Sequence, residues 1–80
     1  MKSEVCEDLE KQLKLLITVY NEENGENLIL ETYSGSLLVM NGEREKVAEI
    51  WVYENKITSS TDNSKPGKII NDFLKEYQMI

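Results

Sequence analysis

The chain has 80 residues, of which 15 are acidic, 9 are basic and none is histidine, giving a formal net charge of −6 at pH 7. A chain of this length predicts a single domain over residues 1–80, whose core supplies only about 3–5 kcal/mol of net stability and leaves little room for a deep pocket. The absence of histidine removes the commonest general base and most catalytic zinc sites. The acidic charge disfavours direct binding of nucleic acid.

The first segment predicts an amphipathic helix from about Ser3 to Tyr20. Apolar residues recur at steps that place them on one helical stripe: Val5, Leu9, Leu13, Leu16, Ile17 and Tyr20. Ser3 can cap the helix, and acidic residues in the first turn complement its dipole. Residues 13–20 also alternate as a strand would, through Leu13, Leu15, Ile17 and Val19. We expect the helix, because no Gly, Pro or Asn separates the two patterns.

The middle of the chain predicts an antiparallel meander. Gly25, in the polar run of residues 21–27, stops the first helix because glycine adopts positive φ without steric cost. Two short apolar runs follow, and each ends in a glycine-containing turn. Residues 47–53 then alternate as a strand, residues 54–56 form a tight turn, and residues 57–59 form a short edge strand.

The last segment predicts a second helix, with a stripe formed by Ile69, Ile70, Phe73, Leu74 and Tyr77. Ser64 is the candidate N-cap, and Pro66 suits the first turn because its missing N–H would be unpaired there. The predicted fold class is therefore α+β in two layers. It has an N-terminal helix, a three- or four-stranded antiparallel meander and a C-terminal helix, with both helices on one face of the sheet.

The Gly-Lys pair at residues 67–68 raises the question of a phosphate cradle. A Walker A loop needs a glycine where Asp62 stands and a serine or threonine where Ile69 stands. Both departures argue against a phosphate site, so a helix start is the expected role. Lys65 and Lys68 oppose the helix dipole, so the stability of this helix does not account for them.

No metal site and no cofactor site is predicted. Cys6 is the only cysteine, which excludes an internal disulfide, and it is expected to be a half-buried structural residue. The polar loop fails the EF-hand pattern, since Gly25 at position 6 would put Tyr20 at the first ligand position. The first residues do not form a signal peptide, and no apolar run is long enough to span a membrane, so a cytoplasmic protein is expected.

The candidate site is a surface for binding another protein. Residues 1–31 hold eight acidic residues against three lysines, a net charge of −5 that suits a basic partner. If the helices cover the apolar face of residues 48–52, Trp51 and Tyr53 lie on the other face as interface anchors. The reverse assignment, favoured for Trp51 by the small size of the domain, puts Trp51 in the core. The predicted partner-binding residues are Glu7, Asp8, Glu22, Glu23, Glu26, Trp51 and Tyr53.

These features predict a small acidic, non-enzymatic binding protein without direct contact to nucleic acid or membrane. Its most specific form is an inhibitor that occupies the basic groove of a nucleic-acid-binding protein, with glutamates in place of phosphates. Small inhibitors encoded by phages and other mobile elements have a similar compositional profile. The alternative is a homo-oligomerising structural or assembly module, because an open sheet edge can pair with a second copy to give a homodimer.

Overall fold

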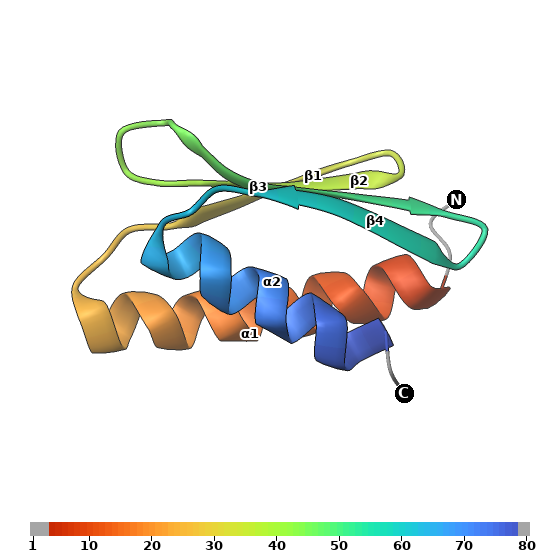
Figure 1. Ribbon diagram of the computed structural model, residues 1–80, viewed down its shortest axis with the longest axis horizontal. Helices are drawn as coiled ribbons and strands as arrows, with labels where there is room; N and C mark the ends of the chain where they lie inside the picture. The colour runs from red at the N-terminus through yellow and green to blue at the C-terminus, as the bar shows by residue number, and fades with distance from the viewer. Residues whose placement is uncertain (1–3, 79–80) are drawn as a thin grey trace.

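The computed structural model describes residues 4–78 and shows two helices packed on one face of a four-stranded antiparallel sheet (Figure 1). The elements are α1 Glu4–Asn24, β1 Ile29–Tyr33, β2 Ser36–Met40, β3 Lys46–Tyr53, β4 Lys56–Thr61 and α2 Lys65–Gln78. The strands lie in the order β1-β2-β3-β4, so each strand pairs with its neighbour in the sequence. The predicted α+β class is confirmed, with four strands in the meander.

Helix α1 runs through the segment in which helix and strand competed. Its buried residues belong to the predicted helical side of the segment: Cys6, Leu9, Leu13, Ile17 and Tyr20. Leu15 and Val19, which produce the strand-like alternation, are 68% and 50% exposed. The strand alternative over residues 13–20 is therefore wrong. Ser3, the predicted cap, lies outside the described residues.

The end of α1 lies at Asn24 and not at the predicted Tyr20. Gly25 follows with a φ of 63°, and the N–H of Glu26 donates to the carbonyl of Asn21 at 3.2 Å, as in a Schellman motif. The Asn21 side chain also donates to the carbonyl of Leu28 and accepts from its N–H, at 3.1 and 2.8 Å. The glycine stop is confirmed, and the polar residues before it remain helical because these bonds satisfy the helix end.

The core lies between the helices and the inner face of the sheet, where α1 contacts β1 and α2 contacts β3 and β4. Its buried cluster draws on both helices, the two central strands and one loop residue: Leu9, Leu13, Ile17, Tyr20, Leu28, Leu37, Val39, Val47, Ala48, Ile50, Ile70 and Leu74. Among residues 4–78 no polar or charged residue is buried. Polar chemistry in the described part of the chain is therefore found at its surface.

Strand register separates an inner face from an outer one. Leu37 pairs with Ile50, and Val39 pairs with Ala48; all four are buried, so this side of the sheet faces the helices. The predicted tight turn between β3 and β4 is confirmed, with Glu54 and Asn55 at φ of 48° and 69°. Two successive residues with positive φ match the type I′ turn, whose twist lets the strands continue pairing. Strand β4 extends to Thr61, beyond the predicted residues 57–59, because it pairs with β3 as far as Ala48.

Candidate functional site

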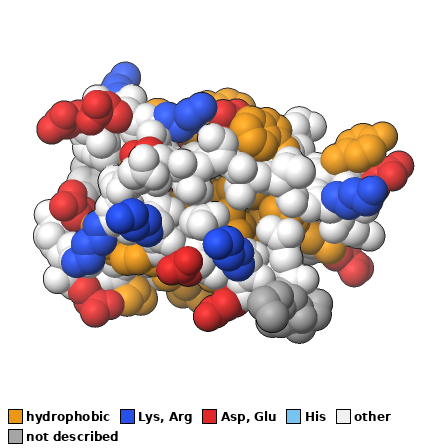
Figure 2. All heavy atoms as spheres, viewed as in Figure 1, with side chains coloured by type: hydrophobic (Ala, Val, Ile, Leu, Met, Phe, Trp, Pro, Cys, Tyr) orange, Lys and Arg blue, Asp and Glu red, His pale blue; other side chains and the backbone are white. Residues whose placement is uncertain are grey.

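The face of the sheet opposite the helices carries most of the exposed large apolar side chains. We call it the open face, and its residues are Ile29, Glu31, Tyr33, Ser36, Leu38, Met40, Lys46, Glu49, Trp51, Tyr53, Lys56, Thr58 and Ser60. Ile29, Tyr33, Trp51 and Tyr53 are 42%, 50%, 40% and 73% exposed. Figure 2 shows hydrophobic side chains along the upper, sheet side of the molecule.

Trp51 lies on the open face and not in the core. It pairs with Ser36 on β2 and Thr58 on β4, whereas its neighbour Ile50 is fully buried against the helices. The assignment that puts Trp51 in the core is therefore wrong, and the one that puts Trp51 and Tyr53 opposite the helices is confirmed. The size of the side chain favours burial, but the alternation of the strand decides the face.

One row across the open face puts two aromatic rings on either side of a small residue. Tyr33 pairs with Ser36, and Ser36 pairs with Trp51. Neighbouring strands lie about 4.8 Å apart, so the backbones of Tyr33 and Trp51 are about 10 Å apart. The Tyr33 hydroxyl donates to Glu31 Oε2 at 2.9 Å, and this bond raises the pKa of Tyr33. The Ser36 side chain is too small to fill the space between the rings.

The open face is electrically neutral among the described residues. It carries two carboxylates, Glu31 and Glu49, and two lysines, Lys46 and Lys56. Lys46 Nζ donates to Glu49 Oε1 at 3.1 Å. An exposed pair of this kind contributes about 0–1 kcal/mol to stability. The acidic excess that gives the chain its net charge of −6 is carried outside this face.

The predicted acidic residues lie on the helical side, in two groups. The first group is Glu7 and Asp8, in the early turns of α1; the second is Glu22, Glu23 and Glu26, in its last turn and the loop that follows. All are exposed. At about 1.5 Å per residue, the two groups are about 22 Å apart along the helix. The structure therefore gathers the second group, separates it from the first, and separates both from Trp51 and Tyr53.

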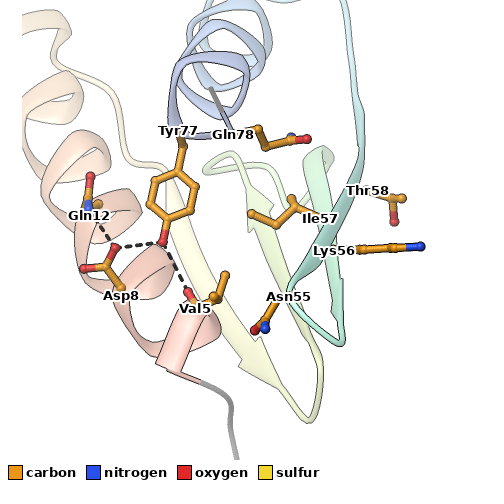
Figure 3. A pocket seen from close by; sticks show the side chains of 9 residues that line it. All are labelled: Val5, Asp8, Gln12, Asn55, Lys56, Ile57, Thr58, Tyr77 and Gln78. Atoms are coloured by element: carbon orange, nitrogen blue, oxygen red, sulfur yellow. Dashed lines mark hydrogen bonds between the residues drawn. The ribbon is translucent and has the colours of Figure 1, made fainter. Parts of the chain in front are cut away.

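A groove of about 680 Å³ lies where the start of α1, the end of α2 and the β3–β4 hairpin meet (Figure 3). It is lined by Val5, Asp8, Gln12, Asn55, Lys56, Ile57, Thr58, Tyr77 and Gln78. Figure 3 shows Ile57 pointing toward Tyr77, whereas Lys56 and Thr58 point away. The groove is larger than the composition suggested, because it forms at the ends of three elements and not inside the small core.

Tyr77 ties the end of α2 to the start of α1 beside this groove. Its hydroxyl donates to Asp8 Oδ2 at 2.7 Å, and Gln12 Nε2 donates to the same oxygen at 2.9 Å. Burial, the hydrogen bond to Asp8 and the negative charge of Asp8 raise the pKa of Tyr77 to about 12. Sequence reasoning placed Tyr77 only in an apolar stripe. A tyrosine at the end of such a stripe is itself a signal, because a partly buried hydroxyl usually finds a partner.

The Tyr77→Phe variant is expected to lose a stabilising contact that depends on pH. The folded state favours the neutral phenol, so the contribution is fully present below pH 10, the ordinary tyrosine pKa, and is lost as the pH rises through about 12. Urea unfolding at pH 9 and pH 11.5 measures it. We expect the free energy of unfolding of the wild type to exceed that of the variant by about 1 kcal/mol at pH 9 and by less at pH 11.5. Tyr53→Phe, at a 73% exposed position, is the control. The difference in free energy of unfolding between wild type and this control should not decrease from pH 9 to pH 11.5.

The segment from Asp62 to Lys68 forms a capped helix start. Ser64 Oγ accepts from the N–H of Gly67 at 3.2 Å, and the Ser64 carbonyl accepts from the N–H of Lys68 at 3.0 Å, so the predicted N-cap is confirmed. Asp62 Oδ1 accepts from the Ser64 N–H at 3.0 Å and from the Ser64 hydroxyl. A carboxylate of the chain itself therefore lies beside this helix start.

Lys65 does not stabilise its own helix, α2, but its side chain contacts the end of α1. Helices α1 and α2 run in opposite directions, so the start of α2 lies beside the end of α1 (Figure 1). Lys65 Nζ donates to Asn24 Oδ1 at 3.1 Å. A cation at this place complements the negative end of the α1 dipole, which offsets its unfavourable position in α2.

Other chemistry finds little support in the described residues. Over residues 4–78, no three or more Asp, Glu, Cys or His side chains gather in a way that could hold a metal ion. Cys6 is 3% exposed and belongs to the buried side of α1, which is deeper than the half-buried position predicted for it. Neither α1 nor α2 combines the length and apolar character that crossing a bilayer requires.

Comparison of the chain with models of known families, with curated proteins and with solved structures found no significant match.

Proposed function

We propose that this chain is a small acidic, non-enzymatic binding protein that engages a basic surface of another protein. The observation that carries the proposal is the distribution of charge. The open face is neutral, so the acidic excess behind the net charge of −6 belongs to the rest of the chain. Its most specific form is a cytoplasmic inhibitor that occupies the basic groove of a nucleic-acid-binding protein; small inhibitors of phages and mobile elements have a similar compositional profile.

The second acidic group is the better anchor for such a partner. Glu22, Glu23 and Glu26 lie within one helical turn and the adjoining loop, and all are exposed. In the first group, Asp8 already accepts hydrogen bonds from Tyr77 and Gln12. Carboxylates that are not held by the fold can turn toward lysine and arginine side chains of a partner. Attraction between exposed charges also speeds association and weakens as salt rises.

The non-enzymatic part of the proposal rests on the groove at Tyr77. General acid–base catalysis is most efficient when the pKa of the catalytic group lies near the working pH. The Tyr77 hydroxyl instead has its pKa raised to about 12 and is held by Asp8 in a contact between two helices. This arrangement stabilises the fold, and it does not prepare the hydroxyl for proton transfer near neutral pH.

Affinity capture from a lysate of the source organism, read by mass spectrometry at low and high salt, tests the proposal. The wild-type chain is expected to retain a basic DNA- or RNA-binding protein at low salt and to release it at high salt. The triple variant Glu22→Gln, Glu23→Gln, Glu26→Gln should retain much less of it.

A triple variant of Glu43, Glu45 and Glu54, each changed to Gln, is the matched control. It removes the same charge from exposed positions in the β2–β3 loop and the β3–β4 turn. It should bind nearly as wild type does. If the amount of partner retained changes neither with salt concentration nor in the Glu22, Glu23 and Glu26 variant, the acidic-surface proposal is contradicted.

The second candidate function is an assembly module whose role is self-association. The observation in its favour is that Ile29, Tyr33, Trp51 and Tyr53, four of the exposed large hydrophobic side chains in the described residues, lie on one face, where a second copy could cover them. A chain that forms a tight dimer and retains no basic protein from the lysate would support this candidate over the first.

A further inference from the structure

We infer that the open face is a self-docking surface, on which two copies of this chain pack sheet against sheet. The inference rests on the neutrality and composition of that face, and it holds whether or not the chain also binds a basic partner. The resulting homodimer would have four layers, with helices outside and two sheets inside.

The first support is the composition of the face. Strand β2 contributes the half-buried Leu38, which lies between Glu31 and Glu49, and the half-buried Met40, which lies between Ile29 and Lys46. The more exposed Tyr33 and Trp51 flank Ser36 in the neighbouring row. Aromatic residues and methionine are enriched in the buried centres of interfaces, while lysine and glutamate are depleted there. On this face the charged residues Lys46 and Glu49 neutralise each other through a 3.1 Å ion pair. A second sheet could cover them without leaving one sign of charge unbalanced.

The second support is charge, which selects a second copy as the occupant. Two copies that each carry −6 repel one another over most approaches. The open face has two carboxylates and two lysines, so it is a surface on which this repulsion is locally absent. A strongly basic partner would gain little from a neutral face and is better served by the acids of α1. The occupant that fits a neutral surface with exposed aromatic side chains on an acidic chain is the same surface of another copy.

The size of the face sets the expected strength of the dimer. Four strands about 4.8 Å apart, each five to eight residues long at about 3.3 Å per residue, give a face about 20 Å across in both directions. Sheets that pack face to face lie about 10 Å apart with their side chains interdigitated. Such an area falls below the roughly 800 Å² per partner of a standard interface. The expected dimer is therefore weak, with a dissociation constant on the order of 10–100 μM.

The pairing is expected to be isologous, with the same residues on both sides. The space between Tyr33 and Trp51 above Ser36 can receive a side chain from the second copy, and Tyr53, at 73% exposure, is the most prominent side chain available to fill it. Covering Trp51 in this way gives a direct signal, because Trp51 is the only tryptophan in the chain.

Sedimentation velocity of the full chain from about 5 μM to 1 mM, a range that brackets the expected dissociation constant, tests the inference. The sedimentation coefficient should rise with concentration, and acrylamide should quench Trp51 less at the high end. Salt separates this dimer from a complex with a basic partner, because screening strengthens contact between two acidic chains and weakens contact between opposite charges. A chain that remains monomeric across this range overturns the inference.

Two charge insertions locate the contact on the face. Ser36→Glu lies on the inner strand β2 and Thr58→Glu on the edge strand β4, and both residues belong to the open face. Each should raise the dissociation constant about tenfold or more, because the interface would bury the new charge twice. Thr18→Glu adds the same charge at an exposed position of α1 and should change the dissociation constant of the dimer less than about twofold. A dimer that resists Ser36→Glu while the variant remains folded by circular dichroism overturns the inference, since it would pair through an edge or another surface.

Discussion

Replacing Leu13 with alanine is expected to lower the free energy of unfolding by about 2–5 kcal/mol. Leu13 is 0% exposed at the middle of α1 and belongs to the single core cluster of the domain. Alanine is the best helix former, so the helix itself is not weakened, and the loss comes from the missing contacts and the cavity they leave. Because the total free energy of unfolding of a domain of this size is only about 3–5 kcal/mol, the variant should be substantially unfolded at 25 °C. Urea unfolding followed by far-UV circular dichroism measures the loss.

Leu15→Ala is the matched control for this core variant. It makes the same chemical change two residues along the same helix, at a side chain that is 68% exposed. Its free energy of unfolding should stay within about 0.5 kcal/mol of wild type. Equal losses at the two positions would mean that α1 does not present the face described above, and they would reopen the strand alternative for residues 13–20.

Replacing Gly67 with alanine is expected to destabilise the domain by about 1–3 kcal/mol. Gly67 lies in the first turn of α2 and is buried. A β-carbon there would lie 2.5 Å from the carbonyl oxygen of Asp62 and still closer to the Asp62 carboxylate. In an ordinary helical position the same change stabilises by about 1 kcal/mol, so the expected sign is the reverse of the helix propensity. Thermal or urea unfolding would reveal the sign.

Gly42→Ala controls for the general effect of replacing glycine. A β-carbon on Gly42 would meet Asn27 Cβ at 3.7 Å, which is ordinary contact, and its φ lies outside the positive range. We expect a change within about 0.5 kcal/mol of wild type. If Gly67→Ala proved as stable as wild type or more so, the close approach of Asp62 to the helix would be wrong, and the Gly-Lys pair would need another explanation.

Most of the fold follows from periodicity in the sequence, and the errors have identifiable causes. The helical stripe of α1 and the stripe of α2 predicted both helices. The strand alternative arose because the exposed Leu15 and Val19 mimic core positions in a pattern that records only hydrophobicity. Element ends were harder to predict. The end of α1 depends on bonds from the Asn21 side chain to Leu28, and the end of β4 depends on its pairing with β3 as far as Ala48 and Thr61. Neither is visible in a hydrophobic pattern.

The candidate site could be predicted residue by residue but not as an arrangement. Alternation in β3 placed Trp51 and Tyr53 on one face, yet their neighbours Tyr33 and Leu38 come from other strands and depend on register. In the sequence, the acidic residues of positions 1–31 form one acidic region. The structure divides the predicted ones between the two ends of a 21-residue helix, because a helix spreads its residues along its axis.

Helix α2 follows the sheet in the chain and completes the core, so during synthesis the sheet is made before the helix that covers it. Ile70 and Leu74 of α2 cover β3 and β4, so the inner face of the meander, including Ile50, stays incompletely covered until α2 leaves the ribosome. The open face carries exposed apolar side chains as well, so for that interval the emerging sheet exposes apolar groups on both faces and has two unpaired edges. At about 5–20 residues per second, adding residues 65–74 takes on the order of one second. Chaperone binding or aggregation during translation is therefore expected to depend on the time between synthesis of the sheet and packing of α2 against it.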